Sequence, residues 1–425
     1  MNRRNYVQAL AAGGIVPSVS MDKSAGNSEI GTEIEEQMNN NNLPNVAQWQ
    51  FSPTPGYDRE DSLFANPYPY EGTVYVGDLG GRLHALNAET GEQRWRYEGA
   101  ELPIWSQPAV HQNKVYFGTG EYENDRGRVY ALNRETGEEE WVVDGYDEPI
   151  QHEIATADGI VYFSVEQETH AVDSETGDQL WSKQFGQGAV PTIREGIAYF
   201  YTGTPVALDA SSGDPIWEAD VDFSTGGHRP FVTENGVFAG NGYYDIETGE
   251  EIFTFDGKLT TESALSADFL FTRVGRKVQV LDTESGDTVR QIDVSGNIRS
   301  MLHSDEILYV GTAQTESGGG QGESGGVLHA IAPETGEHLW AASAINAEIR
   351  LSPHTDSDLL FAAGTTGQLF AVESGVNPFS DTGDSEMPES SSNNRNLPFV
   401  SGLVAVAGTV AYLGYRKFRS DRNKQ

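Results

Sequence analysis

The sequence of 425 residues contains no cysteine and only seven lysines. The absence of cysteine excludes disulfide bonds, thiolate metal sites and cysteine nucleophiles. The scarcity of lysine leaves 64 acidic against 27 basic residues, which gives a formal net charge of −37. Because a surface of that charge repels nucleic acid and anionic lipid, we expect neither as a partner of the main body of the chain.

So acidic a composition is compatible with disorder, but the 10% aromatic content and regular strand patterning over residues 70–372 argue against it. An acidic, lysine-poor and cysteine-free chain resembles proteins of salt-loving archaea, in which surface carboxylates keep a folded protein hydrated in brine. The alternative is an acidic secreted protein from an organism of ordinary salinity.

One long uncharged run lies near the C-terminus, at residues 397–415. As a helix it would be about 28 Å long, close to the ~30 Å hydrocarbon core of a bilayer. The positive-inside rule places the basic tail that follows, residues 416–425, in the cytoplasm and the rest of the chain outside the cell. We therefore predict one helix anchored in the cytoplasmic membrane, with a buried core helix and a cleaved sorting signal as the alternatives. Residues 376–396, rich in Ser, Asn, Asp and Pro, are expected to form a flexible stalk.

The N-terminus agrees with this topology. Residues 1–20 resemble a twin-arginine export signal, in which Arg3 and Arg4 precede a short apolar run and several small residues. Residues 21–44, which include four consecutive asparagines, are expected to form a disordered tether. Export and anchoring together predict a protein exposed at the cell surface.

A repeated peptide fills the region between these ends. It begins with a small residue, a hydrophobe and Asp or Asn, and continues with Thr-Gly and a tryptophan four residues after the glycine, as in Ala85 to Trp95. The turn glycines are Gly91, Gly137, Gly177, Gly213, Gly249, Gly286 and Gly336. The residues four positions later are Trp95, Trp141, Trp181, Trp217, Phe253, Arg290 and Trp340. A repeat near 40 residues has the length of one four-stranded propeller blade.

The residue types of the repeat suit a hairpin between two strands. Glycine adopts positive φ without a Cβ penalty, and the preceding Asp or Asn can bond the backbone of the turn. We assign the tryptophans to the contact between adjacent blades rather than to a ligand site, because a buried indole covers a large apolar area. Phe253 and Arg290 replace tryptophan in two copies, so we expect blades five and six to dock less regularly on their neighbours.

Eight β-rich runs predict eight blades. The last unit ends at residues 369–375 without a tryptophan strand behind it, whereas residues 46–51, which include Trp49, have the character of such a strand and no blade of their own. Closing the ring with this segment removes exposed sheet edges. We therefore predict an all-β propeller of eight four-stranded antiparallel blades over residues 45–375, with seven blades as the alternative count.

The motif resembles the PQQ-type repeat, whose consensus is Ala-x-Asp-x-x-Thr-Gly-x-x-x-Trp. This superfamily includes quinoprotein alcohol dehydrogenases and non-enzymatic propellers, among them the lipoprotein scaffold of the outer-membrane barrel-assembly machinery, which this chain resembles most in character. The dehydrogenases hold a quinone with adjacent cysteines and a calcium ion with Glu, Asn and a catalytic Asp. The chain has no cysteine and offers no convincing calcium set. We expect no cofactor, with PQQ and calcium as the minority alternative.

Two groups of polar residues merit attention as candidate sites. Glu121, Glu123, Asn124 and Asp125 offer oxygen ligands for calcium, but they lack the alternating spacing of a dedicated loop, so a solvated acidic hairpin is favoured. The segments at His152-Glu153 and His228-Arg229 each precede a strand, where blade-entry loops can face the central channel and histidines could bind a metal. No pair of histidines has the spacing of a metal site, so packing or solvent-facing roles are favoured. No catalytic residue is assigned.

Together these features predict a membrane-anchored extracellular propeller that binds proteins or a surface polymer as a scaffold. The alternative is an extracellular oxidoreductase that depends on quinone and calcium or on another metal. That alternative requires carboxylates or histidines from several blades to converge on the axis of the ring.

Overall fold

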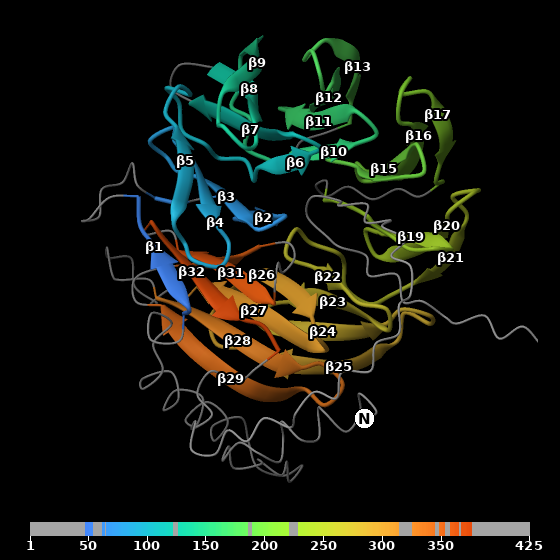
Figure 1. Ribbon diagram of the computed structural model, residues 1–425. Coiled ribbons are helices and arrows are strands. Elements are labelled where there is room, and N and C mark those ends of the chain that lie inside the picture. The colour runs from blue at the N-terminus through green and yellow to red at the C-terminus, as the bar shows by residue number, and fades with distance from the viewer. Residues whose placement is uncertain are drawn as a thin grey trace, which may run out of the picture.

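The computed structural model describes residues 47–53, 62–63, 65–121, 126–185, 189–220, 228–313, 325–344, 348–352, 358–364 and 367–375. In this part of the chain, 32 strands form eight antiparallel sheets of four strands each. The sheets follow one another around a ring (Figure 1). This confirms the predicted eight blades and excludes the count of seven.

The predicted export signal, both tethers, the apolar segment 397–415 and the basic tail lie outside the described residues. Within the described ranges, no helix is long and apolar enough to cross a membrane.

Blades are numbered here in chain order, and within each blade the strands run from the axis outward. The first strands are β2 (Tyr68–Tyr70), β6 (Ala109–His111), β10 (Ala155–Ala157), β14 (Thr192–Arg194), β18 (Phe231–Val232), β22 (Ala264–Leu265), β26 (Asn297–Ser304) and β30 (Ile349–Leu351). The second strands are β3 (Thr73–Gly77), β7 (Lys114–Glu121), β11 (Ile160–Val165), β15 (Ile197–Tyr201), β19 (Gly236–Ala239), β23 (Phe269–Val274), β27 (Ile307–Ala313) and β31 (Leu359–Gly364).

The third and fourth strands complete each blade toward the outside. The third strands are β4 (Leu83–Asn87), β8 (Arg126–Asn133), β12 (Glu168–Asp173), β16 (Pro205–Asp209), β20 (Gly242–Asp245), β24 (Lys277–Asp282), β28 (Gly326–Ala332) and β32 (Gln368–Glu373). The fourth strands are β5 (Gln93–Tyr97), β9 (Glu139–Tyr146), β13 (Gln179–Gln184), β17 (Pro215–Glu218), β21 (Glu251–Thr254), β25 (Thr288–Asp293), β29 (Glu337–Ala344) and, for the eighth blade, β1 (Trp49–Phe51).

The eighth blade is assembled from both ends of the propeller. Strand β1 pairs antiparallel with β32, with Trp49 opposite Ala371. In Figure 1 the blue β1 lies beside the orange β32. The ring is thereby closed by hydrogen bonds between segments that are far apart in sequence.

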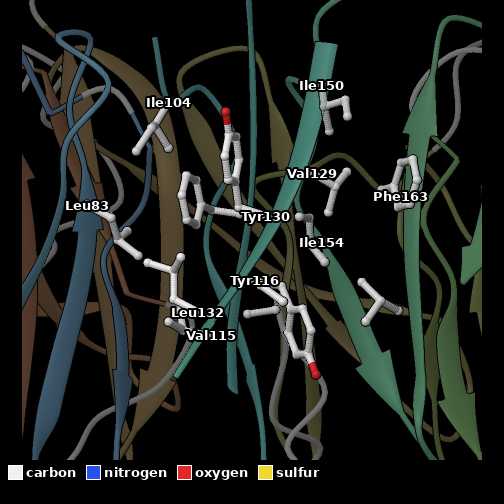
Figure 2. Packing of buried hydrophobic residues seen from close by; sticks show 14 of the residues in the cluster. Leu83, Ile104, Val115, Tyr116, Val129, Tyr130, Leu132, Ile150, Ile154 and Phe163 are labelled. Carbon is white, nitrogen blue, oxygen red and sulfur yellow. The ribbon is translucent and has the colours of Figure 1, made fainter. Parts of the chain in front are cut away.

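The hydrophobic core lies between blades. One cluster of buried residues joins blades one, two and three. Figure 2 shows part of it, with Leu83 of the first blade and Phe163 of the third on either side of Tyr116 and Tyr130 of the second. Because both faces of each blade pack against a neighbour, the second and third strands are buried almost throughout, as their density of β-branched and aromatic residues predicts.

The register of the third and fourth strands explains the small residue of the repeat. Ala207 lies opposite Trp217 within one blade, and the same pairing joins Ala85 to Trp95. Where the fourth strand lacks tryptophan the third carries a larger residue, as with Tyr243 opposite the smaller ring of Phe253. A smaller side chain on the fourth strand therefore leaves room for a larger one on the third.

The turn between these strands is built as the sequence predicts. In the fourth blade the Asp209 carboxylate accepts hydrogen bonds from the backbone N–H groups of Ser211 and Ser212, and Gly213 has φ of +72°. These bonds favour the charged carboxylate, so the side chain and backbone of Ser211 and Ser212 lower the pKa of Asp209.

Candidate functional site

Five tryptophans pack on the turn glycine of the next blade in the ring. The Trp181 indole N–H donates to the backbone oxygen of Ala210 at 3.0 Å, and a methyl group at Gly213 would lie 2.9 Å from the indole ring. The same contact recurs between Trp49 and Gly91, Trp95 and Gly137, Trp141 and Gly177, and Trp217 and Gly249. The glycine thus serves both the turn and the contact between blades.

A tyrosine on the second strand, which sequence reasoning did not single out, strengthens this contact. The Tyr162 hydroxyl donates to the Ala210 oxygen at 3.1 Å, the same oxygen that accepts from Trp181. Two neighbouring blades repeat the arrangement, with tyrosine and tryptophan both donating to the oxygen of Arg134 or of Ser174. A carbonyl oxygen has two lone pairs and so accepts both donors. The tyrosine that recurs in the β-rich runs of the sequence is the feature from which this contact could have been predicted.

The two degenerate copies behave differently from one another. A methyl group at Gly286 would lie 2.7 Å from Phe253, so the phenyl ring occupies the usual place of the indole. At Gly336 the nearest atom, from Arg290, is 3.5 Å away, and the guanidinium donates to the backbone oxygen of Glu334. The expected irregular docking is therefore found at Arg290 and not at Phe253. Trp340, in β29, is buried against Tyr309.

The calcium candidates cannot be assembled into a site from the described residues. Glu121 is the last residue of β7 and pairs in register with Arg126 of β8. Glu123, Asn124 and Asp125 lie outside the described residues. Among the residues that the structure describes, no group of three or more His, Asp or Glu side chains is placed to hold a metal ion.

Charged side chains do converge on the axis of the ring. The guanidinium of Arg229, which precedes β18, lies 3.4 Å from the carboxylate of Glu153, which precedes β10. These residues belong to the fifth and third blades, so they meet only because both reach toward the axis past the fourth. A second bond from Arg229 Nη2 to the Pro191 oxygen, at 2.8 Å, holds the guanidinium on the entry to the fourth blade.

The position of these residues in the strand register is repeated around the ring. Glu153 stands two residues before Ala155, which pairs with the second-strand aromatic Tyr162, and Arg229 stands in the same relation to Phe231 and Phe238. Gln107, Glu262 and Arg350 occupy the equivalent position in three further blades. We call these five residues the axial layer.

Two further carboxylates near the axis, among those that the structure describes, also face arginines. Glu348 lies 3.0 Å from Arg299 and 3.6 Å from Arg350, and Glu262 lies 3.9 Å from Arg273. Among the described residues, these carboxylates each face a guanidinium group and form no shared centre of three or more.

Burial disfavours the charged forms of both Arg229 and Glu153. Burial lowers the pKa of Arg229, while Glu153 acts in the opposite direction. Burial likewise raises the pKa of the Glu153 carboxyl, against the effect of Arg229. Burial also raises the pKa of Tyr68, in β2 of the first blade, and the charge on Arg229 partly offsets this shift. The three groups share one electrostatic environment.

His228, which flanks the axial contact, has a structural role. His228 stacks on Tyr201 with ring centroids 4.5 Å apart, and its Nε2 accepts from the backbone N–H of Gly240 while Nδ1 faces the Arg229 oxygen. This pattern requires the neutral tautomer protonated on Nδ1, and burial lowers the pKa of His228 to about 4. Burial also lowers the pKa of His152. The sequence indicated the right segments, but the adjacent residues Glu153 and Arg229 make the axial contact.

A second feature lies on the outside of the ring. The residue before the tryptophan position is an exposed aliphatic in four consecutive blades, which we call the outer row: Leu180, Ile216, Ile252 and Val289, with 46%, 49%, 52% and 44% of their surface exposed. In the first two blades the position holds Arg94 and Glu140. An acidic residue stands two positions earlier in each blade of the row, at Asp178, Asp214, Glu250 and Asp287.

Comparisons with known proteins agree with this architecture. A family model described as outer membrane protein assembly factor BamB matches residues 44–164 and 165–243, a little under half of the chain. The crystal structure of BamB from Moraxella catarrhalis aligns with a TM-score of 0.59 and 16% identity, over 76% of this chain and 97% of that one. The crystal structure of the computationally designed Ika8 protein aligns with a TM-score of 0.60 and 16% identity, over 74% and 96% respectively. No curated protein matches the sequence.

The fold, the repeated Thr-Gly and tryptophan contacts and the closed ring define an eight-bladed β-propeller. More specifically, the chain resembles the PQQ-type repeat propellers and BamB, in agreement with its sequence motif. At 16% identity the structural likeness shows the fold alone.

Proposed function

We propose that this protein is a scaffold that binds other proteins through the outside of its propeller, and that its C-terminal apolar segment holds it at the outer surface of the cell. The observation that carries the proposal is the outer row, which repeats an exposed aliphatic side chain at one position of four consecutive blades. The name of the matching family refers to outer membrane protein assembly, and a comparable contact with proteins is consistent with a propeller of the same fold.

The chemistry of the outer row favours a protein as the partner. Ile216 and Ile252 are about half exposed, and such side chains offer apolar contact but no hydrogen bonds to the hydroxyl groups of a polysaccharide. Single exposed hydrophobic residues are common on protein surfaces. Their recurrence in successive blades, on a chain of net charge −37, provides the specific argument for an interface.

Site-specific crosslinking on intact cells tests the proposal. A photoreactive residue at position 216 or 252 should capture a defined protein, whereas one at Glu140, the equivalent position of the second blade, should not. The captured protein, once purified, should bind the double variant Ile216→Thr, Ile252→Thr at least about tenfold more weakly, because two apolar contacts are lost. Equal capture at all three positions, or unchanged affinity, would contradict the proposal.

The anchoring part of the proposal needs its own experiment. A chain that ends at residue 396 lacks the apolar run 397–415 and the basic tail. It should be released into the medium as a folded propeller, while the full chain sediments with membranes. Retention of the shortened chain on the membrane would show that another element holds it.

A further inference from the structure

Arg229 has more hydrogen-bonding capacity than the described structure uses. Only 6% of its side chain is exposed, and Nη2 donates to the Pro191 oxygen. Among the described residues, Nε and Nη1 have no hydrogen-bond acceptor. The Glu153 carboxylate balances the charge at 3.4 Å from Nη1. A buried donor without an acceptor is destabilising, and more so when the group is charged.

Gln107 adds a second donor to the same axial layer. The residue is 8% exposed, and its side-chain Nε2 has no acceptor among the described residues. It stands two residues before Ala109, which pairs with Tyr116, so its register in the second blade equals that of Arg229 in the fifth. Two buried groups of the axial layer therefore offer hydrogen bonds, and both require an acceptor.

Among the described residues, the ion pairs near the axis contain more arginines than carboxylates, unlike the whole chain. In these pairs four arginines face three carboxylates: Arg229, Arg273, Arg299 and Arg350 against Glu153, Glu262 and Glu348. The chain as a whole carries 64 acidic and 27 basic residues. An excess of cations surrounded by protein focuses a positive potential, which attracts anions. Solvent reaches this region, since the side chains of Glu153 and Glu348 are 24% and 23% exposed.

We propose that the axial layer binds a ligand carboxylate, whose oxygens accept hydrogen bonds from Arg229 and Gln107 while Glu153 moves aside from the guanidinium. A carboxylate is favoured over a phosphate because the protein's own carboxylate, Glu153, already faces this guanidinium at 3.4 Å. A carboxylate also forms strong charge-assisted bonds with arginine. Glu153 takes the place of the ligand carboxylate when none is bound. This site is independent of the outer row and of the partner proposed for it.

Saturation-transfer NMR on the purified full-length chain can test the site with acetate and succinate as probes. Acetamide, which has the shape of acetate without the charge, is the matched control. We expect saturation of acetate and succinate and none of acetamide. Equal signals from acetate and acetamide, or no signal from either carboxylate at millimolar concentration, would overturn the proposal.

Variants give the residue-level test. Gln107→Ala should weaken acetate binding several-fold, and the double variant Arg229→Gln, Glu153→Gln should weaken it about tenfold or more, because bonds to a charged group are lost. Glu153→Gln alone should strengthen binding, since it removes the competing carboxylate. The double variant Arg96→Gln, Glu98→Gln, at an exposed ion pair of the first blade, makes the same two charge changes away from the axis and should leave affinity unaltered. If the double variant at Arg229 and Glu153 does not fold, the opposite effects of Gln107→Ala and Glu153→Gln still decide the matter. Unchanged affinity in both of these variants would refute the site.

Discussion

The indole ring of Trp181 occupies the space in which a side chain at Gly213 would lie, with only 2.9 Å between the ring and a methyl group at that position. The two residues belong to adjacent blades, and Gly213 also has φ of +72°. One glycine thus meets two separate requirements, one from its own turn and one from the neighbouring blade. The two requirements can be separated experimentally.

Replacing Gly213 by alanine should lower the free energy of unfolding by about 2–4 kcal/mol, because it adds a steric clash to backbone strain. The matched control is Gly196→Ala, where φ is +76° and no atom lies within 4 Å of the added methyl group. This control should cost about 1 kcal/mol, from the backbone alone. Urea denaturation of the two variants measures both values. Equal losses would show that the contact between blades contributes nothing.

The shared acceptor at Ala210 predicts coupling between its two donors. Trp181→Phe and Tyr162→Phe each remove one hydrogen bond to this oxygen, at a net cost of about 1 kcal/mol per bond. Tyr162→Phe changes little else, whereas Trp181→Phe also shortens the ring. The double variant leaves a buried carbonyl without either side-chain donor, so its loss should exceed the sum of the single losses.

A double-mutant cycle by chemical denaturation measures this coupling, which we expect to be about 0.5–1 kcal/mol. Additive losses would mean that each bond acts independently of the other. They would also remove the physical reason for finding tyrosine and tryptophan together in successive blades.

Closure of the ring depends on Trp49. Its indole N–H donates to the Ala88 oxygen at 2.8 Å and its ring lies against Gly91 and Phe361. Trp49→Ala should cost about 3 kcal/mol, and release of β1 would expose the edge of β32 to other chains. We therefore expect a lower unfolding midpoint together with association detectable by analytical ultracentrifugation. Gln50→Ala, an exposed neighbour on the same strand, should produce neither change.

Buried histidines should make the protein lose stability in weak acid. Burial lowers the pKa of His228 and of His303 from 6.5 to about 4, and that of His329 to about 3. The folded state therefore binds these protons less readily than the unfolded chain. These histidines therefore do not reduce the free energy of unfolding above pH 6.5. As the pH falls toward 4, the free energy of unfolding decreases by at most about 3 kcal/mol per histidine.

Unfolding midpoints measured between pH 8 and pH 4 check this expectation. His303 stacks on Phe271 with ring centroids 5.6 Å apart, so His303→Phe keeps an aromatic contact while removing one titrating group. The variant should have a shallower decline below pH 6.5 than the unaltered chain. A flat profile in the unaltered chain, or the same slope in both, would contradict the assignment.

Much of the fold is predictable because one sequence motif recurs at nearly regular intervals along the chain. The turn glycines, the tryptophans and the orphan strand at Trp49 are local features that recur or stand out, and they led to eight blades and their closure. The role of the turn glycine was predicted only in part. Its positive φ follows from the turn, whereas its contact with Trp181 depends on the neighbouring blade.

The axial residues were harder to foresee. The sequence marked the entry segments around His152 and His228, because a polar pair before a strand can face the channel. It could not show that Glu153 and Arg229 meet across a blade, nor that His228 is used in packing against Tyr201. Those relationships depend on the curvature of the ring, which no local pattern encodes.

The sequence by itself determined the number of blades, the strand order within each and the segment that closes the ring, because turn chemistry and the alternation of buried and exposed residues act over short distances. Only the tertiary structure decided which charges pair at the axis, which donors lack an acceptor and which carbonyl serves two blades. Those properties arise where separate repeats come within hydrogen-bonding distance, and closure of the ring brings them together.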